Sequence, residues 1–342
     1  MHSYYVCLFM LPEEVLMNPT SLTRRGALAA VAGAAALPVL GSAAFNTANA
    51  AAPMLGASRP THVRFPLGKF EVTTIFDGAV QLDGPHPIFG QNMTVEEVAA
   101  YAEANNLSGS RMEIGFTPII VNTGSELVLF DTGNGAARRP ARGNLLSALQ
   151  TAGYTPDQID VVVVTHMHPD HIGGLMEDGS PAFPNARYVT GQAEYDFWSP
   201  KEVAEGKLAR VGKLVQANVV PVAEKMSFLG DGGSVASGIT AVGAFGHTPG
   251  HMAYHIESDG KRLLLFADAC NHYVVSMEKP DWHVRFDMDK EAAAATRRKL
   301  LGMVAADKIM ATGYHMPFPA VGFVEPHGSG FRWEAASYQL FL

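Results

Sequence analysis

The chain has 342 residues, of which 47% are hydrophobic and 17% charged, and its formal net charge is −8 at pH 7. This composition excludes a disordered chain, which has low hydrophobicity, and a coiled coil, which is rich in charged residues. The acidic balance disfavours a nucleic-acid partner, because such proteins usually carry a basic surplus. Two cysteines, Cys7 and Cys270, cannot build a disulfide scaffold or a cysteine-rich zinc module, whereas the 13 histidines are numerous.

The first 50 residues have the composition of an export leader. Arg24-Arg25 precedes the uncharged apolar run 27–40, and Ala48-Asn49-Ala50 places small residues at the −3 and −1 positions of a cleavage site. This pattern resembles a twin-arginine signal, and the run is shorter than the about 20 residues of a membrane span. We expect residues 1–50 to be removed on export, with Met17 as a candidate start. A membrane anchor or an ordinary apolar helix is the alternative.

Removal of that leader predicts a periplasmic or secreted protein without stable membrane insertion, formed by residues 51–342. This part alternates predicted strands and helices, and no Pro/Gly/Ser linker divides it, which favours one layered α/β domain. Strands are predicted at 70–77, 119–122, 127–130, 161–164, 263–266 and 309–312, with a hairpin joining the second and third. Helices are predicted to follow a capping box at Thr94, to span 143–152, and to run from Asp289 to Ala306.

Three imidazoles and a carboxylate follow the predicted buried strand 161–164: His166, His168, Asp170 and His171. In an extended segment His166 and His168 point the same way, because side chains alternate with period two, so both can bind one ion. Asp170 and His171 come as the chain turns, and they can face a second ion. A lone histidine is more often a core or surface residue than a ligand. Four zinc-type ligands at one strand end instead predict a metal site.

This His-x-His-x-Asp-His pattern resembles the metallo-β-lactamase superfamily. Other segments resemble the remaining motifs of that family and come in the family's order: 129–133 with Asp131, 246–251 with His247 and His251, 265–268 with Asp268, and 313–317 with His315. The resemblance implies a four-layer αββα sandwich with a two-metal site between the sheets. It also implies two divalent ions, with zinc as the family default.

The same resemblance implies a role for each residue. His166, His168 and His251 would hold the first ion, Asp170, His171 and His315 the second, and Asp268 would bridge them. Asp131 and His247 would support the ligands from behind by hydrogen bonds. Each ion would keep a position for water, which then becomes a nucleophile at neutral pH, and Asp170 or a bound water would protonate the leaving alkoxide.

Two residues narrow the implied reaction. Position 168 is His, whereas a Glu at this position would resemble the diiron, oxygen-reducing branch of the superfamily. The resemblance therefore favours hydrolysis over redox chemistry. Asp268 supplies a bridging carboxylate that zinc β-lactamases lack, which disfavours antibiotic hydrolysis. Segments 165–176, 182–186 and 196–198, together with the Pro-Phe-Pro after His315, resemble the methyl parathion hydrolase branch, which contains organophosphate hydrolases and lactone or aryl-ester hydrolases.

Among the pocket aromatics of that branch, only Trp198 has a clear counterpart in this chain. We therefore expect a small-molecule lactone or carboxylic ester as substrate. A phosphotriester is the alternative, followed by metal-dependent thiol or sulfur oxidation. A homodimer is left open.

Several residues near the predicted site allow two interpretations. The candidate pocket walls are Trp198, His272, Trp282 and Phe318, although core packing explains the tryptophans nearly as well. Cys270 follows Asp268 by two positions and is interpreted as a small buried residue rather than a ligand. Arg138, Arg139 and Arg142 either form a solvated loop or attract an anionic substrate.

Overall fold

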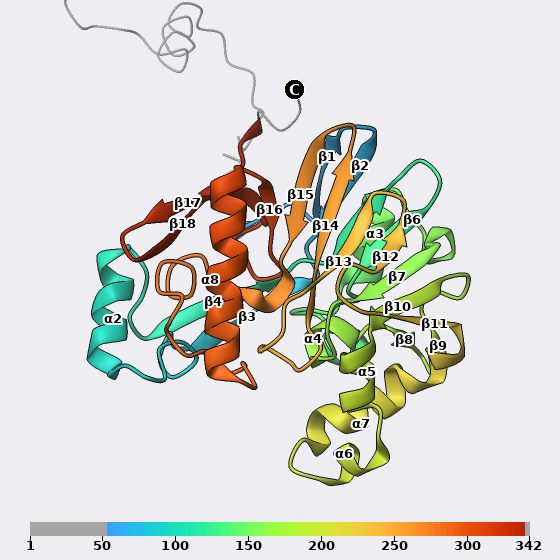
Figure 1. Cartoon of the computed structure of the whole chain (residues 1–342), viewed down its shortest axis with the longest axis horizontal. Coiled ribbons are helices and arrows are strands. Elements are labelled where there is room, and N and C mark those ends of the chain that lie inside the picture. Colours follow the sequence, from blue (N-terminus) through green and yellow to red (C-terminus); the bar gives the residue numbers. More distant parts are fainter. Residues whose placement is uncertain (1–52, 339–342) are drawn as a thin grey trace, which may run out of the picture. The chain divides into compact units, whose positions relative to one another are not determined.

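Two seven-stranded mixed sheets form the centre of the computed structural model, which describes residues 53–338 (Figure 1). In spatial order, sheet 1 consists of β1 (His62–Leu67), β2 (Phe70–Ile75), β5 (Ile119–Asn122), β6 (Leu127–Phe130), β7 (Val161–Val164), β10 (Arg187–Gly191) and β11 (Met226–Leu229). Sheet 2 consists of β12 (Ser234–Ala236), β13 (Ile239–Gly243), β14 (Met252–Ser258), β15 (Lys261–Leu265), β16 (Met310–Thr312), β17 (Val321–His327) and β18 (Gly330–Ala335).

Two short hairpins and several helices complete the fold. The hairpins pair β3 (Gly78–Asp83) with β4 (Arg111–Phe116) and β8 (Met176–Glu177) with β9 (Ser180–Pro181). The α-helices are α2 (Val95–Ala104), α3 (Leu145–Thr151), α4 (Pro169–Ile172), α5 (Gln192–Trp198), α6 (Lys201–Glu205), α7 (Ala209–Asn218) and α8 (Lys290–Asp307). Short 3-10 turns are η1 (Ala136–Arg138), η2 (Pro156–Gln158), η3 (Val220–Lys225) and η4 (Ala267–Ala269).

The all-valine strand β7 explains how the layers stack. Alternate side chains of a strand point to opposite faces, and both faces of β7 are covered. Val161 and Val163 pack in the core between the two sheets, whereas Val162 and Val164 pack in a second core that α3 and α7 help to form. The long orange helix α8 in Figure 1 covers the outer face of sheet 2. The result is the four-layer αββα arrangement that the sequence predicted.

Most predicted elements form close to their predicted bounds. Strands β5 and β6 pair antiparallel as a hairpin, and Thr94 and Glu97 make the reciprocal bonds of a capping box at α2. Asp289 caps α8 by accepting from the backbone N–H of Ala292. The described residues from Ser58 onward form one compact unit. Residues 1–50, which include Cys7, lie outside the described residues, so the leader stays a prediction.

Parallel strand pairs place the candidate site at one edge of each sheet. In sheet 1, β6 and β7 run parallel, so Asp131 and the segment 165–171 both leave the carboxyl ends of their strands. In sheet 2, β15 and β16 run parallel, so Asp268 and His315 also follow neighbouring strand ends. Between residues 53 and 338, no helix combines the length and the apolar character that crossing a membrane requires.

We predict that Thr94→Ala lowers the free energy of unfolding by about 1 kcal/mol, because the first turn of α2 loses its side-chain cap. Urea denaturation measures this change. Thr94→Ser, which keeps a capping hydroxyl, should stay within about 0.5 kcal/mol of the wild type. An equal loss in both variants would contradict the capping role.

Candidate metal centre

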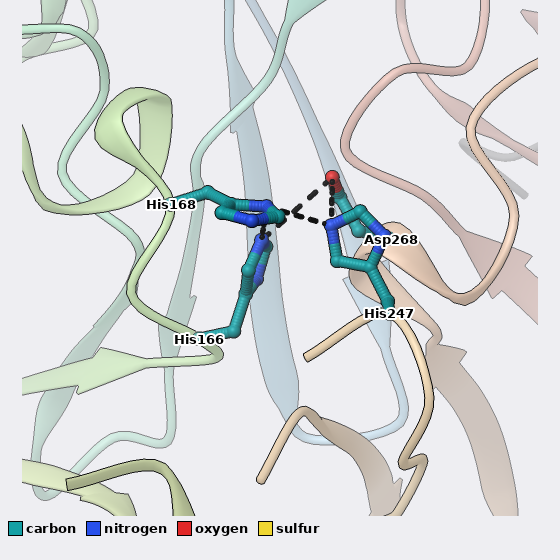
Figure 2. Close-up of side chains that lie close together, drawn as sticks. All are labelled: His166, His168, His247 and Asp268. Carbon is teal, nitrogen blue, oxygen red and sulfur yellow. Dashed lines mark hydrogen bonds and ion pairs between the residues drawn. The ribbon is translucent and has the colours of Figure 1, made fainter. Parts of the chain in front are cut away.

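Seven histidine and aspartate side chains converge in two adjacent groups. His166, His168, His247 and Asp268 make up the first group, and Asp170, His171 and His315 make up the second. In each group the potential ligand atoms lie within 4.8 Å of one another. Figure 2 shows that the first group is assembled from both halves of the fold, with the side chains pointing toward one another. The strand ends of sheets 1 and 2 thus supply opposite sides of one site.

The first group holds three imidazole nitrogens at ligand-like separations. His168 Nδ1 lies 3.1 Å from His166 Nε2 and 2.8 Å from His247 Nε2. Ligands of a tetrahedral zinc ion, each about 2.0–2.1 Å from the metal, would be separated by little more than this. Asp268 Oδ2 completes the group, at 3.3 Å from His247 Nε2 and 3.8 Å from His166 Nε2.

Asp268 also contacts the second group, so one carboxylate lies between the two groups. Its Oδ2 lies 3.1 Å from His315 Nε2, and its Oδ1 lies 3.4 Å from His171 Nε2. Asp170 Oδ2 closes this side at 3.5 Å from His315 Nε2 and 3.6 Å from His171 Nε2. One carboxylate between two sets of imidazoles is the geometry that a bridging ligand requires.

Hydrogen bonds on the far side of the rings fix the direction in which most of them present a lone pair. His171 Nδ1 bonds to Asp131 Oδ2 at 2.8 Å, His247 Nδ1 to Asp287 Oδ1 at 2.8 Å, and His315 Nδ1 to the Gly115 carbonyl at 2.8 Å. Each of these partners is an acceptor, so in the neutral ring Nδ1 donates and Nε2 carries the lone pair that faces the site. Such outer hydrogen bonds are typical of metal-ligating histidines.

His247 and His251 both lie against the first group, with ring centroids 4.8 Å and 4.9 Å from that of His166. The sequence predicted His251 as a ligand and His247 as its support; these two roles stay predictions, and the first group as defined above contains His247. His251 is buried; its Nδ1 donates to the Ala244 carbonyl and its Nε2 accepts from the backbone N–H of Asp268. Through Nε2, His251 contacts the backbone of Asp268, the carboxylate that lies between the two groups. The two histidines share one short motif, so spacing could not distinguish them.

Burial and neighbouring charges shift the pKa values of two histidines in the first group and two in the second in opposite directions. Burial lowers the pKa of His166 and His168 well below the usual histidine value, and nearby histidines lower both further. Burial also opposes a charge on His171 and His315, but the pKa of each is raised nonetheless, with Asp268 the largest opposing influence. His315 and His171 in turn hold the pKa of Asp268 well below its usual range despite its burial. Asp268 is therefore ionised, and His166 and His168 are neutral rings that can each donate a lone pair to a metal ion.

Two buried polar atoms indicate what is needed to complete the site. Within the described part of the chain, His171 Nε2 and Asp268 Oδ1 have no hydrogen-bond partner, although they lie only 3.4 Å apart. Unsatisfied buried polar atoms are rare, and each calls for an explanation. A cation between a lone-pair nitrogen and a carboxylate oxygen would satisfy both atoms. The imidazole and carboxylate donor set therefore fits divalent metals such as zinc.

Buried carboxylates behind the site hold its loops in place. Asp131 accepts from the Thr165 N–H at 2.8 Å and the Thr165 hydroxyl at 2.9 Å, in addition to its bond with His171. Glu194 accepts from the Met167 N–H at 2.8 Å, the Thr248 hydroxyl at 2.7 Å and the Gly250 N–H at 2.9 Å. Glu194 thereby ties the His166–His168 segment of sheet 1 to the His247–His251 loop of sheet 2.

The site opens into a cavity of about 670 Å³, which His168, Asp170, Asp268 and His315 reach. None of the four predicted pocket residues lines it. Trp198 is 1% exposed and packs in a core of sheet 1, and Trp282 is 8% exposed and packs edge-on against Tyr101. His272 and Phe318 border a separate cavity of about 360 Å³ that shares His315. The tryptophans therefore follow the core-packing interpretation rather than the pocket interpretation.

Residues other than the predicted ligands and pocket walls also contribute to the site. Phe89 and Phe116 line the larger cavity, together with Phe286 from the loop 270–287, which the sequence had indicated as the roof of a pocket. Asn271 Nδ2 donates to Asp268 Oδ2 at 3.0 Å. Asp287, which orients His247, pairs with the buried guanidinium of Arg297 at 2.8 Å. Cys270 is buried and lies outside both ligand groups, with its Sγ 3.8 Å from the His272 carbonyl.

Comparison with known proteins identifies the family. A profile of the metallo-beta-lactamase superfamily matches residues 117–310, which is more than half of the chain. The protein belongs to this superfamily. Among solved structures, AidC, described as a dizinc quorum-quenching lactonase in complex with a product, is 28% identical with a TM-score of 0.74; the match covers 81% of this chain and 98% of AidC. The hydrolase AbOPH is 25% identical with a TM-score of 0.73, and that match covers 82% and 99%.

Curated relatives match a shorter part of the chain. A Bacillus subtilis protein named probable metallo-hydrolase YflN is 27% identical over 184 residues, or 48% of this chain and 68% of that protein. The N-acyl homoserine lactonase of Bacillus cereus is 24% identical over 164 residues, or 48% of this chain and 58% of the relative. The chain thus spans little more than half the length of that lactonase.

We predict that Glu194→Gln lowers the free energy of unfolding by about 2–4 kcal/mol, because an amide NH₂ would face donors that now bond to a carboxylate. Chemical denaturation measures the change. Glu202→Gln, on the exposed surface of α6, is the matched control and should shift stability by less than about 0.5 kcal/mol. Similar stability of the two variants would show that Glu194 does not hold the loops together.

Proposed function

We propose that this protein is a dinuclear metal-dependent hydrolase that opens a lactone or cleaves a carboxylic ester. The observation that carries the proposal is the pair of ligand groups with Asp268 between them, four of whose residues line a cavity. The metal-dependent hydrolase class agrees with membership of the superfamily, and the likeness to AidC, a dizinc lactonase, supports the finer assignment.

In this proposal, His166, His168 and His247 hold one ion, and Asp170, His171 and His315 hold the other. Asp268 bridges them, and His251 and Asn271 fix the position of Asp268. Zinc is the first candidate metal, because neutral imidazole and carboxylate suit it and because AidC is described as dizinc. Asp131 and Asp287 orient His171 and His247 from the far side of the rings.

When bound, two such ions would lower the pKa of a water molecule toward neutrality and polarise a carbonyl oxygen. The chain itself supplies positioning and proton transfer. Asp170 reaches the cavity with a side chain that is 23% exposed, so it can hold a proton and pass it to a leaving alkoxide. His168 and Asp268 line the same cavity and fix where the scissile bond must lie.

A phosphotriester remains the second candidate substrate, because Phe89, Phe116 and Phe286 give the cavity aromatic walls that suit an aryl group. Lactones, aryl carboxylic esters and dialkyl aryl phosphates should therefore be compared in one panel by kcat/KM. We expect a lactone or carboxylic ester to give the highest value. A clear preference for the phosphate would favour the second candidate. Consumption of oxygen with a thiol, with iron bound, would instead indicate the oxidoreductase alternative.

We predict that the purified protein holds about two metal ions per chain and that His247→Ala loses about one of them. His251→Ala should retain about two while being less stable, because His251 bonds to the backbone rather than to the site. Elemental analysis and thermal unfolding measure these outcomes, with the exposed His327→Ala as control. Loss of metal in His251→Ala but not in His247→Ala would restore the assignment made from the sequence.

Export to the periplasm is a separate proposal that rests on the leader sequence alone. Replacing Arg24 and Arg25 by Lys should block export and leave the protein in the cytoplasm of a bacterial host, because a twin-arginine signal requires the arginine pair. Cell fractionation followed by immunoblotting measures the outcome. Unchanged export of the double variant would contradict a twin-arginine route.

A further inference from the structure

Three arginines line the larger cavity beyond the candidate metal centre: Arg138, Arg142 and Arg210. The only carboxylates among the lining residues are Asp170 and Asp268, which both belong to the ligand groups. Outside the centre the cavity wall therefore carries positive charge without any negative charge. The arginines come from the segment around η1 and from α7, which are distant in sequence and meet at this cavity.

These three arginines differ from most others in the described structure, which pair with a carboxylate. Arg139 shows the contrast, since its guanidinium makes a two-bond contact with Glu177 at 2.7 and 3.1 Å and does not line the cavity. Arg138, Arg142 and Arg210 make no ion pair with any residue between 53 and 338. Three guanidinium groups at one cavity are thus left without a carboxylate partner among the described residues.

The fold nevertheless holds Arg142 in place. Its Nε donates to Asn134 Oδ1 at 3.0 Å, and Asn134 Nδ2 donates to the buried Asp77 at 3.0 Å. Asp77 also accepts from the backbone N–H groups of Gly143 and Leu145. This network fixes the loop that carries Arg142 while leaving the two terminal nitrogens of the guanidinium without a protein hydrogen bond between residues 53 and 338.

The same loop is packed close to the candidate metal centre. A Cβ on Gly135 would lie 2.1 Å from the Gly173 carbonyl oxygen, so the loop backbone sits directly against the turn that follows His171. The Arg142 Cζ lies 5.8 Å from the centroid of the Phe116 ring, and that ring lies 5.5 Å from the ring of His315. One aromatic ring therefore separates the guanidinium from a candidate metal ligand.

We propose that the natural substrate is an ester or lactone that carries a second, anionic group, and that Arg142 with Arg138 and Arg210 binds that group. The inference rests on the hydrolase function proposed above and specifies its substrate class. The cavity wall also has an apolar part, formed by Val80, Leu82, Ile114 and Phe116 from the β3–β4 hairpin and Val211 and Leu214 from α7, and Phe116 lies between Arg142 and His315. A short hydrocarbon chain would fit between the scissile bond and a carboxylate, which a planar guanidinium binds well.

The test compares two substrates that differ only in the distal charge: 4-nitrophenyl pentanoate and the mono-4-nitrophenyl ester of glutaric acid. We expect the wild type to prefer the glutarate ester. Arg142→Gln should lower kcat/KM for the glutarate ester about 10- to 100-fold and change kcat/KM for the pentanoate ester less than about threefold, because only the former loses a charged hydrogen bond. Arg142→Lys should recover part of the preference, since it keeps the charge.

Lys213→Gln is the matched control, since it removes one positive charge from α7 at an exposed position that does not line the cavity. It should leave the preference unchanged. Raising the salt concentration should reduce kcat/KM for the glutarate ester but not for the pentanoate ester, because exposed charge interactions are screened.

Calorimetric binding of glutarate and of pentanoate to the metal-loaded protein gives a second measurement that does not depend on turnover. Tighter binding of glutarate than of pentanoate, weakened in Arg142→Gln but not in Lys213→Gln, would support the arginine site even if neither ester is hydrolysed. Absence of hydrolysis would count only against the proposed reaction. Equal kcat/KM for both esters and equal affinities in wild type and Arg142→Gln would overturn the inference, whatever the reaction.

Discussion

The buried carboxylate of Glu194 is the constraint on which the geometry of the candidate centre depends. One of its oxygens accepts from Met167, which stands between His166 and His168, and the other accepts from Thr248 and Gly250, which follow His247. Burial raises the pKa of Glu194, and the hydrogen bonds from Thr248, Met167 and Gly250 act against that rise by stabilising the charged carboxylate. Because the two loops belong to different sheets, this side chain sets the distance between the histidines that they carry.

Further buried carboxylates extend the same principle around the site. Asp131 joins Thr165 to His171, Asp287 joins His247 to Arg297, and Asp77 joins the Arg142 loop to the start of α3. A buried charge is tolerated only where it is paired or hydrogen-bonded, so each of these acids requires its partners to stay where they are. These hydrogen bonds hold the imidazole nitrogens directed at a common centre.

Local sequence patterns predicted the strands, the hairpin, the helix caps and the His-x-His-x-Asp-His segment, because each depends on neighbouring residues. Spacing alone does not separate the roles of His247 and His251, because the partners of each ring lie elsewhere in the chain: Asp287, which bonds to His247, comes 40 positions later and reaches it only in the folded chain. The four residues predicted for the pocket differ from those that line the larger cavity for a related reason. Trp198 is large and apolar in either environment, whereas Val80, Phe116 and Val211 line the cavity because the β3–β4 hairpin and α7 meet there.

The positive charge of the cavity would affect both substrate binding and product release. Hydrolysis of an ester converts a neutral group into a carboxylate, so a substrate that enters with one anionic group leaves with two. The unpaired arginines that attract the substrate would therefore also retain the product, and faster capture would be offset by slower release. The positions of Arg138 and Arg210 moderate this effect, because both side chains are exposed to solvent and screened by salt, whereas Arg142 is half-buried. Selectivity for the anionic group thus rests mainly on the one guanidinium that the fold holds in place.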